Sequence, residues 1–438
     1  MQCLGIDIGS TSIKGAVLDL ATMQVGEPVV CAFPPPVTGL SAGRVEVSSR
    51  AICMAVESVL SKLVAKSPDA NRLYFSGQMG GVILIDERGR AVSNYISWRD
   101  QRTVQPNAAG QSTLESMRDC WESNGYLTNL GRELQPGSMS TLLAWLKKQR
   151  QLPHDVIPCP VADFVIARLV GQPIPMHATH AIGMLDLQRD EWHRTALEAI
   201  GLGNLPLPEL ALKVSRVGTA QIGGHSFQVY GSFGDQQCAL RGARLQREEL
   251  SLNVSTGSQV SRRTSQFQPG PYQSRKYFFG DYLDTVTHIP AGRSLNVLVE
   301  LLTELGQADG LAFPNVWKVI QEKVEAVSES DLDVDLSFFA GPLGDRGCIS
   351  GITTENLTVG NLFHAAYRSM AENYRTLADR FQPADWKSIV LSGGLTQGAP
   401  RLRKLIQQRF TAPMRESAGE ETLLGLLDIA QMTVEQKT

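Results

Sequence analysis

The chain has 438 residues, of which 42% are hydrophobic and 19% are charged, a balance that is ordinary for a globular protein with room for two domains. Its net charge of −3 argues against nucleic acid or an anionic membrane as a partner. The seven cysteines are scattered and form no C-x-x-C pair, which argues against a disulfide framework and favours a reducing compartment.

No apolar run reaches 18 residues, so the sequence predicts no transmembrane helix. The first apolar strand is already under way at Leu4, which leaves no room for a signal peptide before it. We therefore expect a soluble cytoplasmic protein.

Residues 1–18 predict a β-hairpin with a hydroxyl-rich tip. Apolar residues alternate with Gly5 and Asp7 along residues 4–8, which is the period of a strand, and residues 13–18 are apolar again. The turn-formers Gly9-Ser10-Thr11-Ser12 separate the two runs.

Such a tip can aim several backbone N–H groups and hydroxyls at one anion, because Gly9 lets the backbone approach closely. Asp7 stands at the strand end as a hard oxygen ligand suited to phosphate-bound Mg²⁺, and Lys14 could reach back as a point charge. The alternative is an ordinary surface hairpin without a ligand.

The first half of the chain continues with alternating helix and strand patterns. An amphipathic helix is predicted from Ser48 to Val64, followed by short strands at residues 73–76 and 82–85. Residues 113–150 read as mostly helical, and Gly171 stops a further helix over residues 162–169.

After a strand at residues 228–230 comes the run Gly231 to Gln237, and here we place the domain boundary. Residues 1–231 are expected to form one domain and residues 232–438 the other.

A second stretch, residues 250–261, repeats the grammar of the first hairpin around Ser255-Thr256-Gly257-Ser258. Two such hairpins indicate two related halves, each offering a phosphate loop to one nucleotide. Neither is a Walker A loop or a dinucleotide-binding fingerprint. Beyond it we expect a helix over residues 295–305 ended by Gly306, a helix over 362–381, a strand over 388–394 and a helix from Pro400.

With these elements in place, the chain resembles the FGGY carbohydrate kinases over nearly its whole length. The motifs that carry the resemblance are Asp7-x-Gly9-Ser10-Thr11, Gly77-Gln78-Met79, Trp98-x-Asp100-x-Arg102, Gly234-Asp235-Gln236, Ser255-Thr256-Gly257, Gly344-Asp345-Arg346 and Ser392-Gly393-Gly394. The resemblance implies an actin/hexokinase-like (ribonuclease H-like) α/β fold, in which duplicated domains flank an ATP and sugar cleft and close over the substrate.

The resemblance also implies roles for single residues. Asp235 would be the catalytic base, Gln236 would hold neighbouring sugar hydroxyls, and Asp7 would hold Mg²⁺ through water. The residues expected to bind ATP are Gly9, Ser10, Thr11, Ser12, Lys14, Thr256, Gly257, Gly292, Asn296, Gly393, Gly394 and Gly398. For Asp235, the alternative is an ordinary turn aspartate.

The expected sugar pocket combines an aromatic floor with a carboxylate and a guanidinium. It comprises Gln78, Met79, Gly80, Trp98, Asp100 and Arg102, together with Asp235 and Gln236. Two alternatives stay open: Trp98 can be a core residue, and Asp100 with Arg102 can be a structural ion pair at a strand end.

Within the family, the chain is most similar to the sedoheptulokinase branch, through Gly183–Asp186, Gly234–Cys238, Leu252–Thr256 and Ser294–Asn296. A primary hydroxyl of a ketose or polyol is then the acceptor, with sedoheptulose converted to sedoheptulose 7-phosphate as the leading candidate. The alternatives are a xylulose- or ribulose-type kinase, and a catalytically silent nucleotide-binding sensor. A homodimer is left open.

Some residues depart from the family pattern or invite other readings. Gly80 stands where many relatives carry histidine, and Gly398 stands where a side-chain amide often touches the adenine. His177 and His180 lack a third metal ligand and are expected to be packed or surface residues, and Cys238 is expected to be a small buried thiol.

Overall fold

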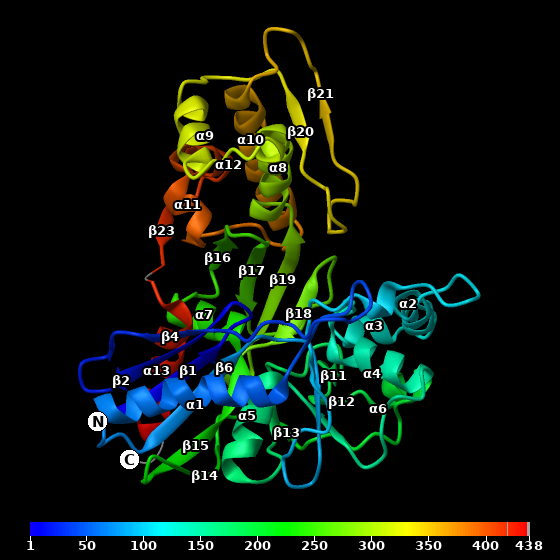
Figure 1. Cartoon of the computed structure of the whole chain (residues 1–438), viewed down its shortest axis with the longest axis vertical. Helices are drawn as coiled ribbons and strands as arrows, with labels where there is room; N and C mark the ends of the chain where they lie inside the picture. Colours follow the sequence, from blue (N-terminus) through cyan, green and yellow to red (C-terminus); the bar gives the residue numbers. More distant parts are fainter. Residues whose placement is uncertain (418, 436–438) are drawn as a thin grey trace.

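The computed structural model describes residues 1–417 and 419–435. Two mixed β-sheets, one in each half of the chain, lie end to end with helices packed on their faces (Figure 1). The N-terminus and the last described helix, α13 (Glu421–Glu435), lie at the end of the molecule formed by the first half (Figure 1).

The first sheet has the strand order β14-β15-β6-β1-β2-β3, and β4 also pairs with β2. Its central strand β1 runs antiparallel to β2 and parallel to β6, so the predicted first hairpin forms the middle of the sheet. The strands are β1 (Gln2–Ile8), β2 (Ser12–Asp19), β3 (Gln24–Val25), β4 (Val29–Ala32), β6 (Arg72–Gly77), β14 (Arg216–Ile222) and β15 (His225–Gly234).

The second sheet has the order β18-β19-β17-β16-β22-β23 and repeats this pattern. β16 runs antiparallel to β17 and parallel to β22, as β1 does to β2 and β6. The two predicted hairpins therefore occupy equivalent positions in duplicated sheets. The strands are β16 (Glu249–Asn253), β17 (Ser258–Thr264), β18 (Gln273–Lys276), β19 (Tyr282–Ile289), β22 (Ser388–Ser392) and β23 (Met414–Glu416).

Helices cover both faces of the first sheet. α1 (Ser49–Lys66) starts at Ser48, whose hydroxyl accepts the N–H of Ala51, as the sequence predicts. α1 and α5 (Val161–Val170) bury their apolar sides on one face, while α7 (Asp235–Gly242) and α13 (Glu421–Glu435) cover the other.

An insertion in the first half carries most of the remaining short elements. Its helices are α2 (Thr113–Ser123), α3 (Tyr126–Asn129), α4 (Met139–Lys148) and α6 (Arg194–Ala199), with a 3₁₀ turn at Arg102–Val104. Its two-stranded ladders are β5 (Glu46–Val47) with β8 (Tyr95–Ile96), β7 (Ile83–Ile85) with β9 (Ile157–Cys159), β10 (Met176–His177) with β13 (Leu210–Ala211), and β11 (Leu185–Asp186) with β12 (Glu191–Trp192).

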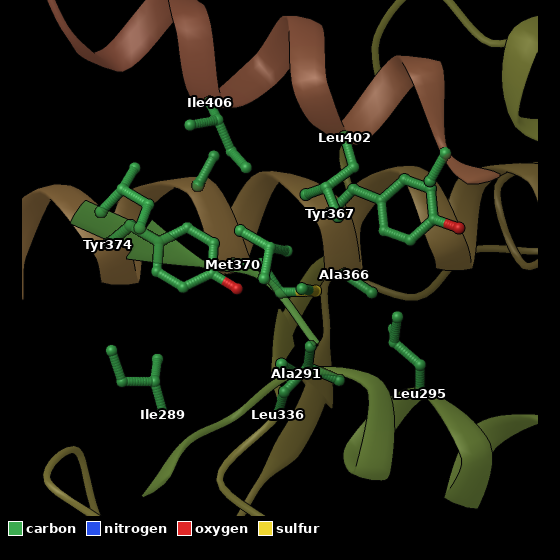
Figure 2. Close-up of a cluster of buried hydrophobic side chains, with 14 of the residues drawn as sticks. Ile289, Ala291, Leu295, Leu336, Ala366, Tyr367, Met370, Tyr374, Leu402 and Ile406 are labelled. Carbon is green, nitrogen blue, oxygen red and sulfur yellow. The ribbon is translucent and has the colours of Figure 1, made fainter. Parts of the chain in front are cut away.

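The core of the second half lies between its sheet and a group of helices. Figure 2 shows Tyr367, Met370 and Tyr374 of one long helix packed between Leu402 and Ile406 on one side and Ile289 on the other. The helices are α8 (Gly292–Ala308), α9 (Val316–Glu325), α10 (Val359–Ala378), α11 (Gly394–Gly398) and α12 (Pro400–Arg409), with the strands β20 (Asp333–Asp335) and β21 (Cys348–Ser350) and a 3₁₀ turn at Phe278–Gly280.

Two helix ends differ from the prediction. α10 ends at Ala378 and not at Phe381. α8 does not end at Gly306 but continues to Ala308, and Gly310 beyond it has φ +80°. Gly306 is needed for packing instead, because a side chain there would meet the ring of Phe313. This glycine therefore indicates a close contact with the Phe313 side chain and not the end of the helix.

The two halves of the chain are joined by continuous and shared secondary structure. The expected boundary between residues 231 and 232 falls inside β15, and α7 follows that strand directly. The last helix, α13, returns from the second half to pack on the first sheet, where Tyr74 and Thr433 share a hydrogen bond of 2.5 Å. Among the residues that the structure describes, no helix is both long and apolar enough to span a bilayer.

Candidate active site

The turn of the first hairpin has its predicted form. The N–H of Gly9 donates to the carbonyl of Ser12 at 3.0 Å, and Thr11 at the tip is exposed. Lys14 pairs with Asp7 across the two strands, but its ammonium group bonds to Glu420 at 2.9 Å. Both side chains of that ion pair are about one third exposed.

Asp7 lies at the end of β1 with its Oδ1 atom buried and without a hydrogen-bond partner. Burial, with the negative charge of Asp235 as a second cause, raises the pKa of Asp7 to about 7, against a smaller lowering by Lys14. Asp7 therefore has one oxygen without a partner and a second carboxylate, that of Asp235, acting on it. A bound cation would compensate the negative charge at this position.

Asp235 is the first residue of α7, directly after the buried end of β15. Its Oδ1 accepts the backbone N–H of Gln236 at 2.8 Å. Burial raises the pKa of Asp235 to about 6, while that hydrogen bond and the charge of Arg275 act in the opposite direction. The carboxylate is thus half-buried and mostly ionised at neutral pH.

Gln236 links Asp235 to the second sheet. Its side-chain N–H group donates to Gln259 at 2.6 Å and to Thr285 at 3.2 Å, and its Oε1 accepts from Arg275. Since Gln259 follows the turn of the second hairpin, the start of α7 is bonded to the second hairpin's strand and electrostatically coupled to Asp7 on the first.

The second hairpin and two of the predicted glycine positions, Gly292 and Gly393, come together. Gly292 donates its N–H to the carbonyl of Ser255 at 3.2 Å, and a side chain at Gly292 would lie 3.1 Å from the Cα of Thr256. Gly393 has φ +93° and no room for a side chain beside the backbone of Val254, which follows β16. Open space surrounds Gly257, Gly394 and Gly398, and Asn296 is exposed one turn into α8.

The sugar-side residues Gln78, Met79 and Gly80 follow β6. The amide of Gln78 donates to the carbonyl of Gly9 at 3.4 Å and its Oε1 accepts from Tyr95 at 3.2 Å, so it is tied to the first hairpin. Met79 packs against Gly234, next to Asp235. Gly80 has φ +74° and lies close to Trp98, which disfavours a side chain at this position.

Trp98 is 37% exposed, so the core-packing alternative for this residue does not hold. By contrast, Asp100 and Arg102 are fully buried and bond to each other at 2.8 Å. Arg102 also reaches Glu46 at 2.7 Å, and Asp100 accepts the N–H of Val45. This pair supports the turn that carries Trp98, and its polar atoms are engaged within the protein.

Sequence reasoning missed Arg275 and Glu133. Arg275 bonds to both Glu133 and Gln236, and its charge acts on Asp235, although Glu133, Asp235 and Arg275 lie far apart in sequence. No local motif identifies Arg275 or Glu133. The only signal in the sequence is their charge, because an arginine in a buried strand and a glutamate in a buried turn are unusual.

The discounted residues behave as expected. His177 and His180 are buried, and burial lowers the pKa of His177 to about 4 and that of His180 to about 3. His180 shares a hydrogen bond with Ser232. Cys238 is fully buried, and burial raises its thiol pKa.

The donor set fits a phosphate-bound cation better than an all-protein metal site. In residues 1–417 and 419–435, no group of three or more metal-ligating side chains is present. Mg²⁺ is commonly held by one or two carboxylates, substrate phosphates and water. The orphaned oxygen of Asp7 beside Asp235 suits that arrangement.

The sequence of the chain is similar to those of known carbohydrate kinases. The FGGY family of carbohydrate kinases, N-terminal domain, matches residues 2–242. Human sedoheptulokinase is 24% identical over 468 residues, covering 94% of this chain and 93% of that protein. Xylulose kinase of Lactococcus lactis is 26% identical over 67% of this chain and 60% of its own length.

Solved structures share the fold. Xylulose kinase from Rhodospirillum rubrum superimposes with a TM-score of 0.85 at 16% identity, covering 99% of this chain and 90% of its own. Plasmodium falciparum glycerol kinase with ADP gives a TM-score of 0.81 at 16% identity, covering 99% and 90%.

The duplicated sheets and these neighbours define an actin/hexokinase-like fold, the class predicted from the sequence. Because the family's N-terminal domain matches more than half of the chain, the protein belongs to the FGGY family of carbohydrate kinases. It is a carbohydrate kinase of a family that uses ATP with a metal ion, and its identity as an enzyme was also predicted correctly.

Proposed function

We propose that the chain phosphorylates the primary hydroxyl of a ketose or polyol with Mg-ATP, and that sedoheptulose, giving sedoheptulose 7-phosphate, is its leading substrate. The observation that carries the chemistry is Asp235, a half-buried carboxylate at the start of α7 between the two hairpins. The similarity to human sedoheptulokinase along nearly the whole chain supports the choice of sugar.

Asp235 acts as the base in this proposal. One of its oxygens accepts the N–H of Gln236, which leaves the other to take the proton of the acceptor hydroxyl. The bond from the acceptor oxygen to the γ-phosphorus forms as the bond from that phosphorus to the β–γ bridging oxygen breaks, and ADP leaves. Phosphoryl transfer has a loose transition state, so positioning and charge supply most of the catalysis.

The two hairpins hold the triphosphate from opposite sides. Backbone N–H groups and hydroxyls of the first turn face the β- and γ-phosphates, and the second turn binds opposite; pre-aimed donors of this kind contribute a large catalytic term. The proposed phosphate ligands are Gly9, Ser10, Thr11, Ser12, Lys14, Thr256 and Gly257. Adenosine lies against Gly292, Asn296, Gly393, Gly394 and Gly398.

Asp7 would hold Mg²⁺ through water, and the cation supplies charge neutralisation for the phosphate oxygens when bound. Lys14 exchanges its contact with Glu420 for phosphate in this proposal. The raised pKa of Asp7 in the ligand-free protein supports a cation site, because burial and Asp235 leave its charge uncompensated.

The sugar rests on Trp98 with Gln78 and Met79 beside it and Gly80 leaving space. Asp100 and Arg102 serve the pocket indirectly, by fixing the turn of Trp98, because their charges are buried in a pair. Gln236 can reach sugar hydroxyls only by sharing or exchanging its bonds to the second sheet.

We also propose two functional domains that meet at the β15–α7 junction, near the predicted boundary at residues 231 and 232. The first domain supplies the sugar pocket and the first hairpin, and the second supplies the second hairpin and the adenosine site. The match of the family's N-terminal domain through residue 242 supports a junction that includes α7.

Xylulose is the second candidate substrate. A xylulose kinase is among the relatives of similar identity, although it aligns over a smaller part of the chain. A catalytically silent sensor is disfavoured, since a nucleotide binder has no need of the acceptor-side Asp235.

A sugar panel tests the proposal. The purified chain is incubated with ATP, Mg²⁺ and each of sedoheptulose, xylulose, ribulose and glycerol, and ADP release is followed with the product's phosphate position assigned by NMR. The proposal expects the highest kcat/KM with sedoheptulose. A preference for xylulose supports the second candidate, and ADP release that no sugar accelerates contradicts kinase activity on this class.

A further inference from the structure

Arg275 of β18 is buried where the two halves of the chain meet. It forms an ion pair with Glu133, which is also buried, and it donates to the Oε1 of Gln236. Glu133 belongs to the turn after α3, and Figure 1 shows β18 beside this helical insertion. Arg275 therefore connects three elements: the second sheet, the insertion and the start of α7.

The turn that holds Glu133 also reaches the sugar side. At one end, the carbonyl of Gly131 accepts the N–H of Ser274 at 2.9 Å, next to Arg275 on β18. At the other end, the carbonyl of Gly137 accepts the N–H of Gly81 at 2.7 Å, and a side chain at Gly137 would collide with the backbone of Trp98. Residues 131–137 are thus fixed against both Trp98 and β18.

The interface around Arg275 is closely packed. The cavity beside it, between the insertion and β18, has a volume of about 10 Å³, which is room for about one water molecule. The guanidinium of Arg275 is buried and bonds to a carboxylate and an amide, so it has little freedom to move. Its position therefore fixes the position of the Gln236 side chain.

We propose that Arg275 is a positioning residue for phosphoryl transfer, which holds Gln236 and the adjoining Asp235 in register with the sugar-side turn at residues 131–137. The proposal rests on the function proposed above. It adds a residue of the second sheet to the machinery that sets the base against the sugar.

Charge gives the same residue a second effect. The titratable or charged groups that interact with Asp235 are Asp7 from β1, Tyr95 from β8, Cys238 within α7 and Arg275. Of these four, Arg275 alone is a cation, and it favours the ionised form of Asp235 that accepts a proton.

The test compares Arg275→Gln with Arg275→Lys and with the double variant Glu133→Gln/Arg275→Gln. The double variant removes both charges, so no unpaired buried ion is left to prevent folding. Lys276→Gln is the matched control, because Lys276 is the next residue of β18 and is likewise buried in an ion pair, with Asp190 at 2.5 Å, but does not bond to Gln236.

With the sugar that the wild-type chain accepts best, Arg275→Gln and the double variant are expected to lose about ten- to a hundred-fold in kcat/KM for the sugar, a loss typical of a misplaced catalytic group. The KM for ATP changes less than about three-fold, the acid limb of the pH–rate profile moves to higher pH, and Arg275→Lys recovers part of the loss. Lys276→Gln leaves the acid limb unmoved.

A readout that needs no substrate separates this proposal from the proposed function. Infrared difference titration of the Asp235 carboxyl, assigned with Asp235→Asn, is expected to give a higher pKa in Arg275→Gln than in the wild type or Lys276→Gln. An unchanged titration, or an acid limb that coincides with the wild type in the folded double variant, overturns the role of Arg275, whichever sugar is accepted.

Discussion

At the scale of single residues, the candidate site contains two carboxylates, Asp7 and Asp235, whose burial in ionised form lowers the stability of the folded protein. Burial raises the pKa of Asp7 to about 7 and that of Asp235 to about 6, and the charge of Asp235 contributes to the raised pKa of Asp7. Strain of this kind is typical of functional sites, where groups are arranged for a ligand and not for the empty protein.

Asp235→Asn is expected to lower kcat by about two to four decades, the usual contribution of a general base, because the amide cannot accept the hydroxyl proton. Binding of a non-hydrolysable ATP analogue, measured by titration calorimetry, stays nearly unchanged since the variant keeps both hairpins. Turnover close to the wild-type value in this variant would remove the base from Asp235.

The same substitution is expected to stabilise the ligand-free protein at pH 7.5. Asp235 has a folded pKa of about 6 against an ordinary value of 3.8, so between these values the folded state binds a proton that the unfolded state lacks. Stability from this group is therefore present at low pH and lost as pH rises through 6.

Asp235→Asn should accordingly raise the free energy of unfolding by about 1–3 kcal/mol at pH 7.5 and by about half as much at pH 5. Thermal unfolding at the two pH values, followed by calorimetry, measures the difference. Equal stabilisation at both pH values, or destabilisation at both, would contradict the raised pKa.

At the scale of elements, the two hairpins could be predicted because their signals are local. Strand alternation and a run of Gly, Ser and Thr define each turn within a dozen residues, and both hairpins formed in the middle of a sheet. Gly306 shows the limit of such reasoning. The helix continues through this residue, and glycine is needed there because a side chain would collide with the ring of Phe313.

A hydrogen bond from α10 holds the turn of the second hairpin. The hydroxyl of Tyr374, fully buried in the core of Figure 2, donates to Ser258 at 2.8 Å, and Ser258 accepts the N–H of Ser255 at 3.2 Å. A helix residue thereby supports the turn to which we assign nucleotide binding.

Tyr374→Phe is expected to raise the KM for ATP about three- to ten-fold, because the turn loses a hydrogen bond of about 1 kcal/mol while the KM for the sugar stays within about two-fold. Tyr367→Phe on the same helix is the control, since its hydroxyl contacts Gln321 and not the hairpin. Equal effects of the two variants on ATP would assign the loss to the core alone.

At the scale of the whole molecule, the sequence indicated duplicated halves but not how they join. The ion pair of Arg275 with Glu133 and the return of α13 to the first sheet connect residues far apart in the chain, where no periodicity or motif can register them. The same holds for Asp100 and Arg102. Their motif suggested a sugar contact, and their burial depends on Glu46 and Trp145, which lie far away in the sequence.

The central claim is that one triphosphate is held between the turns at residues 9–12 and 255–258 while Asp235 receives the proton of a sugar hydroxyl. A crystal structure of the chain with a non-hydrolysable ATP analogue, Mg²⁺ and the best-accepted sugar tests it most directly. The account predicts both turns in contact with the phosphates, the halves closed over the ligands, and a primary sugar hydroxyl within hydrogen-bond distance of Asp235. A hydroxyl bound away from Asp235, or phosphates touched by one turn alone, would contradict it.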